Sequence, residues 1–385
     1  EALRDPDLPD IVRRVLEIRT ALGKTSVAKY STMLVAHCQD HRLRGILQFY
    51  GANRSGRWAG RLVQTHNLAK NTLPDLALAR KLAAEGDFET MGTLFGETAF
   101  VFSELIRTAF IPSEGCRFVV SDFSAIEARV LAWIAGEEWT LEAFRQGKHI
   151  YCETASMMYH VPVEKHGANS HLRQKGKVAV LACGYQGGVG AMKRMDKGGT
   201  IPEDELQSVV DQWRGANPSV VKLWRNCEMA ARTVIEEHRT VRLKNGIAFG
   251  YINGNLFIKL PSGRKLCYWN THLKTDPRDG REHIVYMGVN QETKQWGETE
   301  TYGGKLVENI TQAIARDCLA ISMQRVAALG YNIVMHVHDE MIVDVPIEDT
   351  DALERINACM GEAIPWAPGL PLRGDGYETP FYMKD

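Results

Sequence analysis

Apolar residues near the start of the chain recur at the spacing of one helix face, as in Ile11, Val15, Ile18 and Leu22. This spacing predicts helices over 9–22 and 25–48. The stretch 50–71 is rich in Gly, Arg and Asn, and we predict it to be irregular and basic. Similar apolar spacing predicts further helices over these ranges: 75–94, 140–159, 172–187, 203–213, 218–238, 304–329 and 349–363.

Short apolar runs predict strands in three parts of the chain. One covers 117–122 and is followed at once by a helix to about Ala135. Between 240 and 300, turn dipeptides such as Asn253-Gly254 separate short strands. A strand pair covers Asn332 to Val345 and is interrupted by a charged turn. Long runs of helix with strands clustered late predict the α+β class.

Composition narrows the possible protein classes. The 385 residues are 44% hydrophobic and 24% charged, which suits a globular protein with a sizeable core. No apolar run is long enough to span a membrane, and the acidic start has no signal-peptide pattern, so we expect no membrane partner. Eight scattered cysteines form no C-x-x-C pair, which argues against zinc ribbons and redox motifs and favours a reducing, cytoplasmic location.

The net charge is −1, but the charges are unevenly distributed. Residues 11–70 hold eleven Lys and Arg against two acids, and 165–195 hold six against none. The last fifty residues are acid-rich. Separate basic and acidic zones fit a polyanion held beside a carboxylate site for cations, although solvated faces that cancel would give the same totals.

Asp122 ends the apolar strand at the point where a helix begins. A carboxylate at a strand end can be presented rigidly to a metal ion. A structural alternative stays open, because Ser124 and Glu127 have the spacing of a capping box and Asp122 could be an ordinary turn residue.

A second carboxylate site lies in the turn of the predicted strand pair. Alternation puts Ile333, Met335 and Val337 on one face of the first strand, and the turn is formed by His338, Asp339 and Glu340. No glycine eases this turn, so it gathers polar groups where Asn-Gly would be less strained. An exposed, charged turn without function is the alternative.

The third feature is a basic helix face. Arg173, Lys177, Leu181 and Tyr185 recur every four residues, so on one long helix they would share a face. The two cations lie near the helix N-terminus, which already favours anions. The face could hold a triphosphate at one end and stack a base at the other, and an amphipathic helix with a basic flank is the alternative. We reject a P-loop at Gly23-Lys24-Thr25, because its first glycine is missing and no strand precedes it.

These three segments, in this order, resemble motifs A, B and C of the family A DNA polymerases. Motif A resembles VSDFSAIEARVLAWIAGE at 120–137, motif B resembles RQKGKVAVLACGY at 173–185, and motif C resembles HVHDEMIV at 336–343. Supporting matches are Ser55-Gly56-Arg57, Asn67-Leu68 and ENITQAIARDCL before motif C. The details are most similar to the phage and prophage branch, and the resemblance covers roughly residues 20–385.

The resemblance implies a right-hand polymerase fold, with an antiparallel palm sheet, helical fingers and a reduced helical thumb. It places the thumb and a basic primer-template segment in 1–62 and the first part of the palm, with motif A, in 63–139. Fingers with the motif B helix would occupy 140–300, and the second part of the palm, with motif C, would occupy 301–385.

The implied activity is template-directed addition of dNTPs to a primer 3′-hydroxyl with release of pyrophosphate. Two Mg²⁺ ions, for which Mn²⁺ can substitute, would be held by Asp122, Asp339 and the backbone carbonyl of Phe123, with Glu340 as a further catalytic carboxylate. Nucleotide-binding residues carried over from the family are Arg173, Lys177, Leu181, Tyr185, Glu127, His149 and Tyr151, with Glu127 blocking a ribose 2′-hydroxyl. DNA-binding residues carried over in the same way are Lys24, Arg57, Asn67, Gln312, Asn309 and His338. Partners would be primer-template DNA, dNTPs and unidentified replication proteins.

Several positions depart from the family pattern, although none removes a metal ligand. Leu181 stands where the family commonly has Phe or Tyr, which puts sugar discrimination in question, and Tyr151 stands where it has His. Phe123, Ala125 and His336 stand where it commonly has Tyr, Gln and Gln.

Two other classes compete with a DNA polymerase. A single-subunit RNA polymerase must admit the 2′-hydroxyl, which Glu127 opposes. A primer-template binding protein without chemistry would not need Asp122 and Asp339. Many relatives carry a proofreading exonuclease, but the only upstream D-x-E, Asp87-Phe-Glu89, lies in a helical stretch, so we expect no proofreading from this chain.

Overall fold

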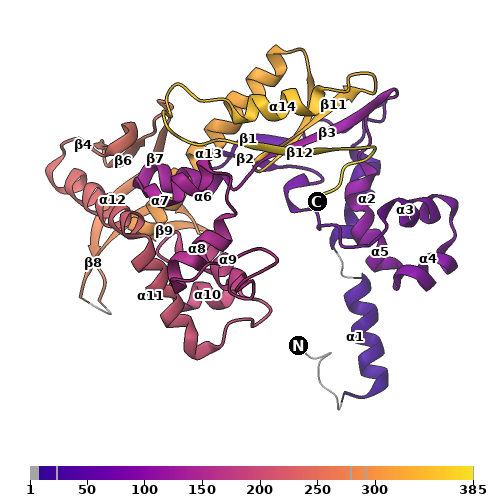
Figure 1. The fold of residues 1–385 in the computed structure, drawn as a ribbon, viewed down its shortest axis with the longest axis horizontal. Helices are drawn as coiled ribbons and strands as arrows, with labels where there is room; N and C mark the ends of the chain where they lie inside the picture. The colour runs from indigo at the N-terminus through magenta and orange to yellow at the C-terminus, as the bar shows by residue number, and fades with distance from the viewer. Residues whose placement is uncertain (1–7, 23–24, 278–279, 291–292, 385) are drawn as a thin grey trace.

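A computed structural model describes residues 8–22, 25–277, 280–290 and 293–384. It contains a two-stranded, a four-stranded and a six-stranded sheet, all antiparallel, among helices. Figure 1 shows the N-terminal helices on one side, α6 to α12 on the other, and the four-stranded sheet with α14 across the top. Gly23 and Lys24, where the sequence analysis rejected a P-loop, lie outside the described residues.

The N-terminal helices form a lobe of their own. Tyr30 joins its parts, because its hydroxyl donates to the Phe102 carbonyl at 2.9 Å and the two rings meet edge to face. The single helix predicted over 75–94 is wrong: Gly86 ends one helix in the left-handed region, and Asp87 caps the next through the amide of Thr90. The helices of this lobe are α1 (Asp10–Leu22), α2 (Thr25–Ala36), α3 (Leu76–Glu85), α4 (Phe88–Phe95) and α5 (Thr98–Leu105).

Two predictions for the basic segment are also wrong. The helix predicted over 25–48 ends at Ala36, and the segment predicted to be irregular contains the hairpin of β1 (Leu47–Ala52) and β2 (Arg57–Gly60). Gly56 closes the turn with φ of 72°, in the left-handed region that favours glycine. The hairpin therefore presents Arg57 on an ordered strand.

The four-stranded sheet has the order β10-β11-β3-β12 and carries both predicted carboxylate segments. The strands are β3 (Cys116–Phe123), β10 (Asn332–Val337), β11 (Glu340–Pro346) and β12 (Gly374–Thr379). The predicted strand pair is confirmed, but β12 was not predicted. A register irregularity between Ile333 and Met335 also corrects the predicted face, because Met335 and Val337 pack on one side and Ile333 packs with the main core on the other.

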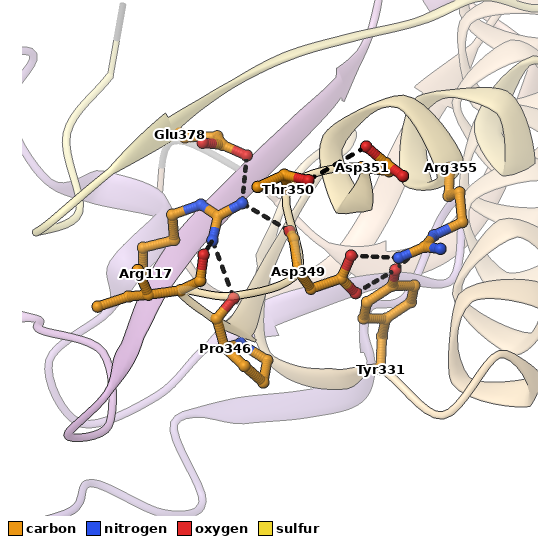
Figure 2. Close-up of polar contacts among 9 residues, drawn as sticks. Arg117, Tyr331, Pro346, Asp349, Thr350, Asp351, Arg355 and Glu378 are labelled. Carbon is orange, nitrogen blue, oxygen red and sulfur yellow. Dashed lines mark hydrogen bonds and ion pairs between the residues drawn. The ribbon is translucent and has the colours of Figure 1, made fainter.

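Arg117 ties together the strand ends farthest from the carboxylates (Figure 2). Its guanidinium donates to the backbone carbonyls of Pro346, Ile347 and Asp349 at 2.7–2.9 Å and to Glu378 at 2.8 Å. Asp349 in turn accepts from Tyr331 and Arg355, which fixes the loop that leads into α14 (Ala352–Gly361). One half-buried cation thus locks β3, β11 and β12 together.

The remaining helices pack into the main core. Helix α9 lies tightly against α8 because Gly176 has no side chain, and a Cβ there would collide with the Tyr151 carbonyl. These helices are α6 (Ile126–Ala135), α7 (Glu138–Arg145), α8 (Ile150–Tyr159), α9 (Leu172–Cys183), α10 (Val189–Met195), α11 (Leu206–Ala216), α12 (Pro218–Glu237) and α13 (Gly303–Ala328). Over the described residues, none is both long and apolar enough to cross a membrane.

The six-stranded sheet has strands in sequence order, β4 to β9. Its inner face, with Leu256, Ile258, Leu266 and Tyr268, joins the core formed by α12 and α13. Tyr268 accepts a hydrogen bond from Asn309 of α13 at 2.8 Å. The strands are β4 (Val241–Arg242), β5 (Ala248–Ile252), β6 (Asn255–Lys259), β7 (Lys265–Thr275), β8 (Glu282–Val289) and β9 (Trp296–Thr301).

Candidate active site

The two predicted carboxylate segments meet at one end of the four-stranded sheet. Strand β3 delivers Asp122, whose register partner on β11 is Glu340 and on β12 is Asp375. The amide of Phe123 donates to the Asp339 carbonyl at 3.2 Å, so the end of β3 is bonded directly to the β10–β11 turn. His338 occupies that turn with φ of 55°, a conformation that costs energy for a residue other than glycine.

The carboxyl groups of Asp122 and Asp339 are electrostatically strained. Burial, and then the charge of Asp339, raises the pKa of Asp122 to about 7. Burial also raises the pKa of Asp339 above its ordinary value. The Oδ1 atom of Asp122 is buried and has no hydrogen-bond partner. A cation placed between these carboxyls would relieve both the repulsion and the unsatisfied oxygen.

Glu340 is held by a network that sequence analysis did not predict. Its carboxylate is buried and accepts from the Tyr382 hydroxyl and from the Lys384 ammonium, the latter at 3.1 Å. Arg107 donates to the same Tyr382 hydroxyl at 2.6 Å. The Lys384 ammonium also lies 3.8 Å from Asp122. The last residues of the chain carried no pattern that predicted this contact.

Glu127 does not form the capping box that its spacing with Ser124 allowed. The residue before α6 is Ala125, in the left-handed region with φ of 52°, and no side chain caps the helix. Glu127 instead accepts from Arg57 at 3.0 Å and from the Tyr185 hydroxyl at 2.9 Å. Burial and the Glu127 charge raise the pKa of Tyr185 well above its ordinary value, so this hydroxyl stays protonated and donates.

A cavity of about 430 Å³ joins the three motif segments. Seven predicted site residues line its wall: Arg57, Glu127, Tyr151, Leu181, Tyr185, His338 and Asp339. Ala125 of the motif A segment also lines it. A second hollow of about 310 Å³ contains Asp122, Phe123, Glu340 and Lys384. The carboxylate pair therefore stands between two hollows, with the Asp339 side open to the larger one.

The basic helix is shorter than predicted. Helix α9 ends at Cys183, so Tyr185 lies beyond it and not on its face. Arg173 lies 3.3 Å from Nε2 of His149 and over the Tyr151 ring at 5.9 Å from its centroid. Lys177 has no hydrogen-bond or ion-pair partner among the described residues. Neither cation is part of the cavity wall, whereas Leu181 and Tyr185 are.

The predicted DNA-binding residues fall in different environments. Lys24 lies outside the described residues. Asn67 is exposed and donates to Gln64 at 3.2 Å, and Gln312 is half-buried beside Glu308. Asn309 is buried against Tyr268, which counts against a direct contact with DNA.

Aromatic rings surround the motif C strand. The rings of Trp58 and His336 meet edge to face with centroids 4.6 Å apart, and the Arg316 guanidinium lies over the Trp58 ring at 4.1 Å from its centroid. Burial, followed by the Arg316 charge, lowers the pKa of His336 to about 4. The rings of His66 and His338 lie 4.9 Å apart, and burial also lowers the pKa of both. The histidines that support the site are therefore neutral near pH 7.

The two carboxylates fit a divalent cation, such as magnesium, that is coordinated by the substrate as well as by the protein. Among the described residues, no three His, Cys, Asp or Glu side chains form a group that could hold a metal by themselves. Mg²⁺ is usually bound by one or two carboxylates together with water and substrate phosphates. Asp122 and Asp339 supply two such carboxylates, and the Oδ1 atom of Asp122 has no hydrogen-bond partner.

The family model and the related sequences that match this chain are described as DNA polymerases. The sequence model of "DNA polymerase family A" matches residues 99–245. The chain is 52% identical over 377 residues to a DNA polymerase of Bacillus phage SP02, which covers 98% of this chain and 58% of that protein. It is 28% identical to the thermostable DNA polymerase I of Thermus aquaticus, over 65% of this chain and 25% of that protein. The chain thus spans less than two thirds of the length of these relatives.

A solved structure shares the fold. The POL domain of Pol1 from M. smegmatis, in complex with DNA primer-template and dNTP, superposes with a TM-score of 0.62 at 18% sequence identity. The match covers 93% of this chain and 51% of that chain. This likeness confirms the predicted α+β class and right-hand fold.

Proposed function

The chain belongs to DNA polymerase family A, and on that premise we propose that it extends a DNA primer along a template by adding dNTPs and releasing pyrophosphate. The observation that carries this proposal is the meeting of Asp122 and Asp339 at one sheet end, beside a cavity formed by all three motif segments. Buried carboxylates that repel each other are stabilised when a substrate brings cations with it.

Asp122, Asp339 and the backbone carbonyl of Phe123 hold two Mg²⁺ ions in this proposal, and the ions supply the Lewis acidity that activates the primer hydroxyl and stabilises pyrophosphate. Glu340 supports the pair from within the sheet. Its buried carboxylate anchors Lys384 beside Asp122, so the chain itself supplies a cation at this point.

Arg173 and Lys177 bind the triphosphate in this proposal. Their side of α9 lies next to the cavity wall formed by Tyr151 and Leu181, and the Lys177 ammonium has no other partner among the described residues. Phosphoryl transfer depends mainly on positioning and charge, which two cations on one helix can supply. His149 orients Arg173 through their 3.3 Å contact.

Glu127 selects the sugar, and Tyr185 supports the base pair next to it. Glu127 is fixed from two sides by Arg57 and Tyr185, so its carboxylate cannot move aside for a ribose 2′-hydroxyl. Arg57, His338 and Gln312 contact the primer end, where the minor groove offers the same acceptors for every base pair. Asn67 contacts the DNA backbone nearby.

The domains follow from the packing. We assign the four-stranded sheet with α13 and α14 as the palm, and α8 to α11 as the core of the fingers. The thumb is α1 to α5, which extends past the boundary at residue 62 because α3 and α4 pack with α5, and α5 packs with α1 and α2. The β4–β9 sheet is assigned to none of these three domains, and it packs on α12 and α13.

Primer extension with each dNTP and rNTP, with and without Mg²⁺, tests the proposal. We expect extension with the complementary dNTP only when a divalent cation is present. Preference for rNTPs would instead indicate an RNA polymerase, and primer-template binding without extension under any condition would indicate a binding protein.

A further inference from the structure

The outer face of the β4–β7 part of the six-stranded sheet is open to solvent. Side chains alternate along each strand, so the residues next to the core residues Leu256, Ile258 and Leu266 in the sequence point outward. We call this surface the β4–β7 face, and its residues are Arg242, Gly250, Ile252, Phe257, Lys259, Lys265 and Trp269. Trp269 is 57% exposed and Ile252 is 58% exposed, which is costly for a surface without a partner.

The charge of this segment is strongly one-sided. Residues 239–275 contain seven Lys and Arg and no Asp or Glu, in a chain whose net charge is −1. Arg242, Lys259 and Lys265 surround a hollow of about 410 Å³. None of these three cations pairs with a carboxylate in the part of the chain that the structure describes. Nothing within the sheet therefore neutralises them, and a polyanion would.

A half-buried aromatic ring, Phe257, lines the hollow. Phe257 stands between Gly250 on one neighbouring strand and Cys267 on the other. A side chain at Gly250 would meet no atom within 4 Å, so the space beside the Phe257 ring is empty. Lys259 and Lys265 form the next register row, and Trp269 lies diagonally across β6 and β7 from Phe257. Rings beside a row of cations suit bases and phosphates that follow one another along a strand.

The start of β7 is hydrogen-bonded to elements of the proposed primer-template site. Arg264 donates to the Ser55 carbonyl at 2.9 Å, two residues before Arg57, and to Asp317 of α13 at 2.9 Å. The Tyr50 hydroxyl donates to the Lys265 carbonyl at 3.5 Å. Arg264 and the first residue of β7 are thus attached to the β1–β2 hairpin, which carries Arg57, and Arg264 also to α13, which carries Gln312.

We propose that the β4–β7 face binds the unpaired template strand outside the duplex, with Phe257 and Trp269 stacking on bases and Lys259, Lys265 and Arg242 contacting phosphates. The inference rests on the proposed function for the identity of the strand. Duplex DNA fits the face less well, because paired bases are stacked on each other and cannot cover the rings. Proteins that bind single strands without sequence preference combine the same two features.

Fluorescence anisotropy with labelled primer-templates tests the proposal. The DNAs share one duplex and carry either a short or a long single-stranded template overhang. For Lys259→Gln/Lys265→Gln, we expect the extra affinity for the long overhang to fall roughly tenfold, with a salt slope lower by about 1.4, since each phosphate contact to a single strand contributes about 0.7. Phe257→Leu keeps the apolar packing but removes the ring, and it should reduce the same overhang-dependent affinity.

The matched control is Lys274→Gln/Lys294→Gln, which removes two exposed lysines, one from the far end of β7 and one from the segment between β8 and β9, and should leave the overhang effect unchanged. Affinity for the short-overhang DNA and extension of its primer should stay normal in all variants. The proposal would be overturned if Lys259→Gln/Lys265→Gln and Phe257→Leu both kept the wild-type gain in affinity for the long overhang. It would also be overturned if these variants lost as much affinity for the short-overhang DNA as for the long-overhang DNA. Because anisotropy needs no turnover, a wild-type chain that binds the overhang but extends no primer would contradict the proposed function alone.

Discussion

Glu127 connects residues from three distant parts of the sequence. Its two oxygens accept from Arg57 in the β1–β2 hairpin and from Tyr185 after α9. Removing the carboxylate would leave both donors without a partner and open the cavity wall beside them. These contacts argue against a helix cap and support the proposed gate.

Glu127→Ala should raise ribonucleotide incorporation relative to dNTP on the order of ten- to a hundredfold, the scale of about 1–3 kcal/mol expected when one close contact excludes a substituent. Single-nucleotide extension with paired rNTP and dNTP measures this ratio. Glu127→Gln keeps the volume and should retain most of the discrimination, and Tyr185→Phe removes one hydrogen bond but keeps the ring. The gate is contradicted if the folded Ala variant discriminates like the wild type.

Lys384 is the cation that the chain places among its own carboxylates. Its ammonium contacts Glu340 and lies near Asp122, and its charge lowers the pKa of Asp122 and Asp339 against the stronger effect of burial. Without this charge, three acids would face one another.

Lys384→Met should lower the free energy of unfolding by about 1–3 kcal/mol in the absence of divalent cations, because a buried carboxylate loses its charged partner. Mg²⁺ should restore much of this loss, so it should raise the melting temperature more in the variant than in the wild type. Lys305→Met, which breaks a surface pair with Glu308, is the control and should respond to Mg²⁺ as the wild type does. Equal Mg²⁺ shifts in all three proteins would refute this role for Lys384.

At the scale of elements, strand β10 carries a buried histidine, His336, that is neutral near pH 7 and packs beside the site. His336 is buried against Trp58, and its pKa of about 4 lies below the ordinary value of 6.5. Between these two values the unfolded chain binds a proton that the folded chain excludes. The free energy of unfolding must therefore fall as the pH drops from about 6.5 toward 4.

His336→Gln should flatten this pH dependence by roughly 3 kcal/mol between pH 7 and pH 4, because a pKa difference of about 2.5 units corresponds to at most about 3.4 kcal/mol. Chemical denaturation at a series of pH values measures it. His166→Asn alters an exposed histidine and should keep the wild-type slope. If His336→Gln and wild type lose stability in parallel, His336 is not the group that titrates.

Elements with a strong local pattern were predictable. The β3–α6 unit and the β10–β11 pair follow from an apolar run, a charged turn and a second apolar run. The hairpin β1–β2 was missed because its short strands mix Gly, Arg and aromatic residues and have no clear alternation. The capping box failed for a tertiary reason: Arg129 binds the Ser124 carbonyl, and the Ser124 amide donates to Arg373, which leaves Ala125 in the left-handed region.

At the scale of the whole molecule, the site is assembled from segments far apart in the sequence. Asp122 and Asp339 could be selected as candidates because each ends a strand, but their meeting depends on the pairing of β11 with β3. The contacts of Glu127 with Arg57 and of Lys384 with Glu340 are long-range and leave no local pattern. Sequence reasoning therefore selected the candidate residues, and the sheet order brings them together.

The central claim is that Asp122 and Asp339 act together in primer extension, and single-turnover extension by Asp122→Ala and Asp339→Ala tests it most directly. Each variant should lose at least about a thousandfold in rate, as expected when several kcal/mol of charge stabilisation is removed, while affinity for primer-template DNA stays near the wild-type value. Asp375→Asn, beside Asp122 on β12, controls for a general loss of negative charge and should still extend. Near-normal extension by either Ala variant would contradict the account.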